Sequence, residues 1–225
     1  MTGTRPLPWY FAPTIVLIAG CTVAIVNRGI GSSFGLFTLP ISEANAWPRE
    51  TYSLAIALQN FVLGIATPIA GMLADRYGSA RVIIAGAVVY CLGILLMAST
   101  STPIYFHFSA GILVGIGLAL SSFGIVMAAL GRIVPPEKRS WAFGLATAAA
   151  SLGQFIFAPL TGALIAAYGW HTALLFLAAS TVLIIPFALP LLVSNSNTSR
   201  ADAGETKLSM TEAIGKAFGH RSYML

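Results

Sequence analysis

Few side chains in this sequence could do chemistry, and the most unusual of them is Arg28. It lies about 15 residues into the first long apolar stretch, or roughly 22 Å along a helix. An arginine at this depth in a bilayer is costly unless it is paired or hydrated, so it marks a functional site by default. A guanidinium binds a carboxylate through two parallel hydrogen bonds, which predicts anion binding. The alternative is that Arg28 extends outward toward Glu43 or Glu50.

Uncharged polar residues also occur inside the apolar stretches. Some surround Arg28 on one helical face, and others stand singly in the second and fifth stretches. Because hydrogen-bonding groups need partners in lipid, they either line a solute cavity with Arg28 or simply tie helices together. The predicted substrate-binding residues are Arg28, Asn27, Gly31, Gln59 and Gln154.

No constellation of catalytic or cofactor-binding residues is visible. The histidines lack H-x-x-H or H-E-x-x-H spacing, and no phosphate-binding loop occurs. Cys21 and Cys91 lie in apolar stretches without metal-ligand spacing. We therefore expect no enzyme, no metal and no cofactor, and we expect any transport to draw on an ion or exchange gradient rather than ATP.

The composition places the chain in a membrane. Of its 225 residues, 57% are hydrophobic and 8% are charged, and the mean hydropathy is +0.84. A soluble domain carries about 25% charged residues, so most of this surface must face lipid. The net charge of +5 is spread over short loops and tails, which argues against a nucleic-acid partner.

Six stretches are long and apolar enough to span a bilayer as helices, each needing about 20 residues. Residues 1–193 are therefore expected to form a six-helix membrane domain. The polar residues 194–225 are expected to form a cytoplasmic linker that approaches a seventh helix absent from this chain. The predicted spans are about 13–38, 52–73, 82–98, 104–130, 142–167 and 172–193.

Basic residues predict the orientation. Of the 12 lysines and arginines, Arg28 lies in a span and Arg49 in an outer loop, which leaves ten on the inner side if the N-terminus is inside. Cytoplasmic loops of membrane proteins carry such an excess. Both ends of the chain are therefore expected in the cytoplasm.

An internal repeat is the most specific pattern in the sequence. The motif P-x-x-G-x-L-x-x-x-Y-G runs from Pro68 to Gly78 and again, 91 residues later, from Pro159 to Gly169. The tetrapeptide S-S-F-G at residues 32–35 recurs after 89 residues. Two matches at nearly one offset indicate a three-helix unit present twice, with the second copy inverted. The alternative is that the matches are chance, because prolines and small residues recur in any membrane helix. The prolines of the motif, Pro68 and Pro159, are expected to kink their helices.

The segment G-M-L-A-D-R-Y-G-S-A-R at residues 71–81 resembles the loop between helices 2 and 3 of the major facilitator superfamily. The resemblance covers essentially the whole chain. It implies an all-α integral membrane fold, the N-terminal half of a transporter, made of two inverted three-helix repeats, with a C-terminal six-helix half as its partner. The gating loop that it implies comprises Gly71, Asp75, Arg76, Gly78 and Arg81.

Asp75 is the residue of this loop to which the resemblance gives a role, as a latch of the outward-open state. From the residues alone, Asp75 can pair with Arg76 or Arg81, or face a helix N-terminus. Gly71 would let helices approach closely, and Gly78 can end its helix in a left-handed cap. The alternative is a plain positive-inside loop.

A narrower similarity rests on residues 29–40, the W-x-R segment 47–49 and Gln59-Asn60. These are similar to bacterial carriers related to oxalate:formate exchangers and monocarboxylate transporters. The similarity implies symport or antiport of a small organic anion, a monocarboxylate or dicarboxylate, across a bacterial cytoplasmic membrane. Gly111 stands where many proton-coupled facilitators carry an arginine, which argues against that route of coupling. Alternatives are a truncated, non-transporting membrane protein or sensor, and a facilitator of another substrate, as in drug efflux.

Overall fold

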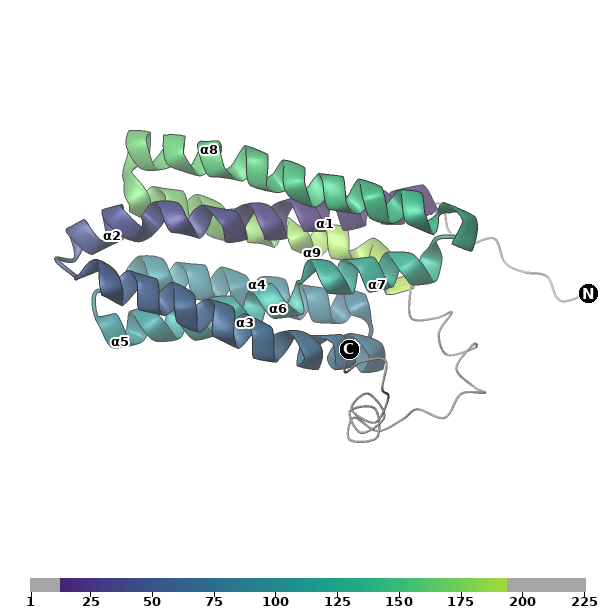
Figure 1. The fold of residues 1–225 in the computed structure, drawn as a ribbon, viewed down its shortest axis with the longest axis horizontal. Helices are drawn as coiled ribbons and strands as arrows, with labels where there is room; N and C mark the ends of the chain where they lie inside the picture. Colours follow the sequence, from purple (N-terminus) through teal and green to yellow (C-terminus); the bar gives the residue numbers. More distant parts are fainter. Residues whose placement is uncertain (1–12, 194–225) are drawn as a thin grey trace, which may run out of the picture.

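The computed structural model describes residues 13–193; the expected linker at 194–225 lies outside the described residues. Every element of this part of the chain is helical, and the longer helices lie side by side along one axis (Figure 1). Helices satisfy their own backbone hydrogen bonds, as a lipid environment requires. The elements are α1 (Pro13–Ser33), η2 (Phe34–Phe37), α2 (Thr38–Ala44), α3 (Arg49–Tyr77), α4 (Ser79–Ser99), α5 (Pro103–Phe106), the π-helical η3 (His107–Leu113), α6 (Val114–Leu120), α7 (Phe123–Ile133), α8 (Pro136–Val182), α9 (Ile184–Ala188) and η4 (Leu189–Val193).

Five helical segments of the described chain are long and apolar enough to cross a membrane. The last of them, Pro136–Leu192, has 57 residues, nearly three times the length that a 30 Å hydrocarbon core requires. Its backbone leaves the helical conformation at Gly169, with φ 81° and ψ 165°, and the ribbon reverses direction at that end of α8 (Figure 1). The five segments are Thr14–Ala44, Arg49–Tyr77, Ser79–Ser99, Pro103–Ile133 and Pro136–Leu192.

Gly169 has a counterpart in Gly78, which ends α3. The two hold the last position of the repeated motif, and they are the two described glycines with positive φ, 97° at Gly78 and 81° at Gly169. Because ψ is 140° at Gly78, the backbone is not in the left-handed helical region, and the expected left-handed cap is replaced by an extended conformation available to glycine. Pro68 and Pro159 lie inside α3 and α8; kinks at these prolines stay a prediction.

The repeated S-S-F-G tetrapeptide coincides with irregular helix in both copies. After Ser33 the chain tightens into the 3-10 turn η2, and Ser121 and Ser122 leave the helical conformation between α6 and α7. The hydroxyl of Ser33 donates to the carbonyl of Gly29 (3.0 Å), and that of Ser121 donates to the carbonyl of Gly117 (2.6 Å). Such bonds let serine compete with the helical pattern. The span expected at 104–130 is therefore a broken helix.

Glycines of α1 and α8 lie where these two helices approach each other closely. A Cβ atom on Gly153 would lie 2.1 Å from the carbonyl oxygen of Ile25, and one on Gly29 would lie 2.5 Å from Phe157 Cδ2. Small residues permit such approaches in membrane bundles. A Cβ on Gly71 would meet nothing within 4 Å, so the expected close approach there is wrong for the described part of the chain.

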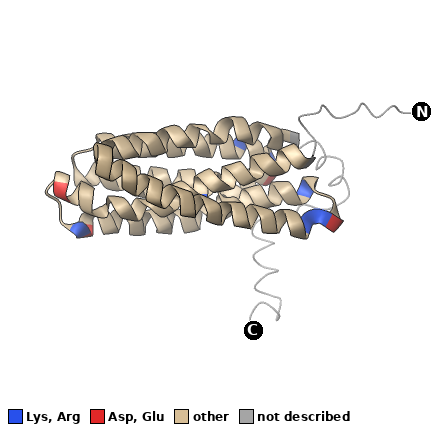
Figure 2. Cartoon of the chain, turned by 90° about the horizontal axis from the view of Figure 1, so that it is seen from above, with Lys and Arg blue, Asp and Glu red and all other residues tan. Residues whose placement is uncertain are grey.

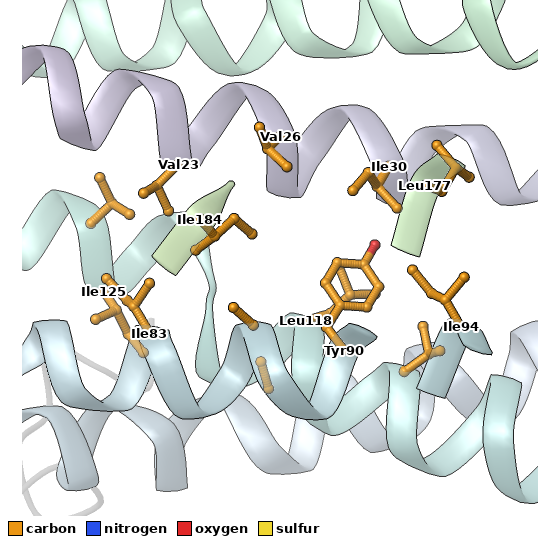
Figure 3. Packing of buried hydrophobic residues seen from close by; sticks show 14 of the residues in the cluster. Val23, Val26, Ile30, Ile83, Tyr90, Ile94, Leu118, Ile125, Leu177 and Ile184 are labelled. Carbon is orange, nitrogen blue, oxygen red and sulfur yellow. The ribbon is translucent and has the colours of Figure 1, made fainter. Parts of the chain in front are cut away.

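Apolar side chains fill the space between α1 and α4 (Figure 3). Tyr90 lies among them, fully buried, and its hydroxyl has no hydrogen-bond partner among the described residues. Charged residues instead gather mainly at the two ends of the bundle (Figure 2). This division matches a lipid-facing middle between two aqueous surfaces. The labelled core residues around Tyr90 are Val23, Val26, Ile30, Ile83, Ile94, Leu118, Ile125, Leu177 and Ile184.

Candidate solute cavity

A cavity of about 440 Å³ lies between α1, α3, the break that separates α6 from α7, and α8. Its volume is within the range of small-molecule sites, roughly 300–1,000 Å³. The structure brings all five predicted substrate-binding residues to its wall, from three different helices; their binding of a substrate stays a prediction. They are Asn27, Arg28 and Gly31 of α1, Gln59 of α3 and Gln154 of α8.

Arg28 is exposed on the cavity wall. Its guanidinium forms no ion pair with Glu43 or Glu50; the ion pair of the described residues joins Arg132 and Asp75 instead. None of the described residues that line the cavity is acidic. The wall therefore carries one positive charge that no described carboxylate neutralises.

The side chains of two glutamines of the wall have no hydrogen-bond partner among the described residues. The side chain of Gln59 is 5% exposed, and its Oε1 atom is buried without a partner. Its backbone carbonyl lies against α6, where a Cβ on Gly115 would come within 2.9 Å of it. Gln154 is half-buried and likewise unpaired. Because a desolvated amide without a partner costs free energy, these groups are suited to meet a polar ligand.

Asn27 differs from these residues because its side chain is already bonded. Its Nδ2 atom donates to Ser121 Oγ over 2.8 Å, and both residues are buried. Asn27 thus ties α1 to the break that precedes α7, which is the helix-linking role left open for it. Asn60, also on the wall, donates to the carbonyl of Ile56 within its own helix (2.8 Å).

Sequence reasoning missed the part of the wall made by the second S-S-F-G copy. Ser122, Phe123 and Gly124 line the cavity, and the hydroxyl of Ser122 is buried without a partner among the described residues. The first copy contributes Phe34 and its neighbours to the same wall, where Tyr52 donates a hydrogen bond to the Phe34 carbonyl (2.6 Å). The repeated tetrapeptide could have indicated these residues, because both of its copies line one cavity.

The predicted gating loop lies at the turn between α3 and α4. Asp75 pairs with Arg132 of α7 and not with Arg76 or Arg81. The guanidinium of Arg76 lies over the ring of Tyr77 instead, 5.3 Å from its centre. Adjacent residues of a helix point in different directions, which is why Arg76 cannot face Asp75. Pairing within the loop, one of the two alternatives for Asp75, is therefore wrong for the described residues.

Gly111 lies in η3 and faces α3. A Cβ at this position would lie 2.7 Å from Leu58 Cδ2, and the residue is buried. A long charged side chain has no room there in this structure. The glycine found where many proton-coupled facilitators carry an arginine thus agrees with the packing of η3 against α3.

Comparison with known proteins agrees with a transport role. Residues 16–224 match the family described as Major Facilitator Superfamily. Monocarboxylate transporter 13 of Rattus norvegicus is 32% identical over 160 residues, which cover 71% of this chain and 36% of the relative. Monocarboxylate transporter 11 of Homo sapiens is 31% identical over 183 residues, with 78% and 38% covered.

The chain thus spans less than two fifths of the length of these relatives. The matched proteins are transporters, in agreement with the expectation that the chain is not an enzyme. They come from animals, so the expected bacterial cytoplasmic membrane stays a prediction.

Proposed function

This chain belongs to the major facilitator superfamily, and on that premise we propose that it forms the N-terminal half of a secondary transporter for a small organic anion. The solute is a monocarboxylate or a dicarboxylate, moved by alternating access between the two sides of the membrane. The matched relatives carry the name monocarboxylate transporter, which supports a carboxylate. A C-terminal six-helix half completes the cavity in this proposal.

We further propose six spans arranged as two inverted repeats. The break at Gly169 would separate the fifth span from the sixth, as Gly78 separates α3 from α4. The S-S-F-G copies support the same relation, because each marks an irregular helix on the wall of one cavity. Nested three-helix repeats of this kind are typical of secondary transporters.

The orientation in this proposal puts both chain ends in the cytoplasm. The end of the bundle at the α3–α4 turn carries Arg76, Arg81 and Arg132, whereas the opposite end carries Arg49. The positive-inside rule then makes the first end cytoplasmic. The Asp75–Arg132 pair would join the inner ends of the two repeats, where a latch of the outward-open state belongs.

The observation that carries the anion proposal is the unneutralised charge of Arg28. A guanidinium facing a cavity to which residues 13–193 contribute no acidic side chain is stabilised when an anion enters, because the anion supplies the missing counter-charge. Gln59 and Gln154 have free amide groups on the same wall. Their N–H groups can donate to further oxygen atoms of the anion.

Uptake into proteoliposomes tests this function. The protein to reconstitute is a carrier in which this chain is continued by a C-terminal half, with radiolabelled butanoate or butanedioate as solute. We expect saturable uptake that rises when the vesicles are preloaded with unlabelled anion or placed in an ion gradient. Absence of anion uptake together with transport of a lipophilic cation would favour drug efflux, and absence of all transport would favour a sensor.

A further inference from the structure

We propose that the cavity binds a small dicarboxylate, with one carboxylate held by Arg28 and the other by the N-terminus of α7. The inference rests on the proposed function, because it names the substrate class of the same cavity. It requires two separate groups of donors on the wall, close enough for one short molecule to reach both.

The second group of donors is the start of α7. Ser122 precedes this 11-residue helix, and Phe123 and Gly124 form its first turn on the cavity wall. The N–H groups of Ile125 and Val126 donate to the Ser122 carbonyl (3.1 and 3.3 Å). Those of Phe123 and Gly124 donate to no carbonyl of the described residues. The Ser122 side chain makes no capping bond, so two backbone donors are left free, as anion-binding helix ends require.

Space in front of these donors is open. A Cβ on Gly124 would have a single neighbour within 4 Å, Ser122 Oγ at 3.8 Å, and Gly124 is exposed. The opposite end of the break is covered, because a Cβ on Gly86 of α4 would lie 2.7 Å from the carbonyl carbon of Leu120. The cavity therefore meets the positive end of α7, while the negative end of α6 packs against α4.

An independent feature of the same wall also points to a ligand. The side chain of Gln59 is 5% exposed and has no hydrogen-bond partner among the described residues; its Oε1 atom is buried, and its Nε2 atom, a donor, is the accessible part of the amide on the cavity wall. Burying an amide without a partner is unfavourable. A bound molecule with several oxygen atoms would supply an acceptor for its N–H groups, which the protein itself does not.

The hydrogen bond between Asn27 and Ser121 holds α1 against the break that precedes α7, the two elements that carry the donor groups. Asn27 precedes Arg28, and Ser121 precedes Ser122, and their side chains are joined over 2.8 Å. Arg28 and the start of α7 line the same cavity, and in this proposal one short solute reaches both. The helix end adds roughly half a positive charge to that of Arg28. A dianion uses both, whereas a monoanion leaves one of them without a counter-charge.

Calorimetric titration in lipid nanodiscs tests this proposal, with the carrier in which this chain is continued by a C-terminal half as the protein and with butanedioate and butanoate as ligands. We expect butanedioate to bind at least about tenfold more tightly, the effect of one additional charge-assisted hydrogen bond or more. The key variant is Phe123→Pro, which removes one free N–H. Proline suits the first position of a helix, and Ser122 already has the extended backbone that proline prefers before it (ψ 150°).

Phe123→Ala is the matched control, because it removes the same ring and keeps the N–H. Relative to this control, Phe123→Pro should weaken butanedioate binding about tenfold and butanoate binding to a smaller extent, so that the preference for butanedioate falls. Gly124→Leu provides a second variant should the proline disturb folding, since its side chain would fill the open space before the helix end. It should likewise weaken butanedioate selectively.

Two sets of results separate this inference from the proposed function. Equal binding of the two anions, with both lost in Arg28→Gln, overturns the dicarboxylate proposal and leaves the anion site intact. Equal losses in Phe123→Pro and Phe123→Ala overturn it as well. Binding of neither anion to the wild-type carrier, or binding of both unchanged in Arg28→Gln, overturns the proposed function itself.

Discussion

Asp75 at the end of α3 forms an ion pair with Arg132 near the end of α7, 57 residues further along the chain. The two side chains are 66% and 27% exposed, respectively. This pair connects helices from the two halves of the sequence repeat. Exposed ion pairs contribute only about 0–1 kcal/mol to stability. In our proposal this pair therefore acts by favouring the outward-open state and not by stabilising the fold.

We expect Arg132→Gln to have the same effect as Asp75→Asn in the complete carrier: slower transport and lower access to the outer side of the cavity. Thermal stability should change by less than about 1 kcal/mol in both variants. Transport rates and the labelling of a cysteine at the exposed Ser32 measure the two effects. Arg76→Gln is the matched control, because Arg76 contacts Tyr77 and not Asp75. Equal losses in Arg76→Gln and Arg132→Gln would contradict a specific role for the pair.

Cysteine labelling in sealed cells checks the six-span topology. In a background without Cys21 and Cys91, a cysteine at the exposed positions Ser101 or Tyr168 should react with a membrane-impermeant reagent, and one at Lys138 should not. Tyr168 is the critical site, because it precedes the break at Gly169. Failure of Tyr168→Cys to react while Ser101→Cys reacts would mean that Gly169 does not divide two spans.

Gly153 should tolerate no larger side chain. In Gly153→Ala the new methyl group would lie 2.1 Å from the Ile25 carbonyl oxygen, so α8 must move away from α1. We expect a destabilisation of about 1–3 kcal/mol, as for other overpacked sites, measured by thermal unfolding in detergent. Gly162→Ala is the control, since a Cβ there meets nothing within 4 Å and alanine favours the helix. Equal stability of the two variants would contradict the close packing of α1 on α8.

Arg28 should determine anion affinity. Arg28→Gln removes the charge and should weaken carboxylate binding at least about tenfold, while Arg28→Lys keeps the charge but loses the planar fork and should weaken binding less. Uptake kinetics in proteoliposomes give both values. Arg49→Gln serves as the control, because Arg49 is exposed and does not line the cavity. Normal carboxylate uptake by Arg28→Gln would show that Arg28 is not part of the binding site.

Several properties of this protein follow from the sequence alone. The low content of charged residues and the lengths of the apolar stretches predict membrane helices. A lipid bilayer requires apolar side chains and internally bonded backbone groups in each spanning segment, however the segments pack. The loop at residues 71–81 indicated the major facilitator superfamily, and the match of residues 16–224 to that family confirmed it. Arg28 could be singled out because an isolated charge in an apolar stretch is costly in any arrangement of the helices.

The partners of the polar side chains depended on the tertiary structure. Asp75 pairs with Arg132 and Asn27 with Ser121, across separations of 57 and 94 residues, because the rotation of each helix decides which side chains meet. The free N–H groups of Phe123 and Gly124 depend equally on the break between α6 and α7. The sequence repeat marked that position, but whether the break faced lipid, protein or a cavity was decided by the packing of α6 against α4. Hydrogen-bond partners are a property of the assembled bundle, whereas the cost of placing a charge in lipid is already set by each segment.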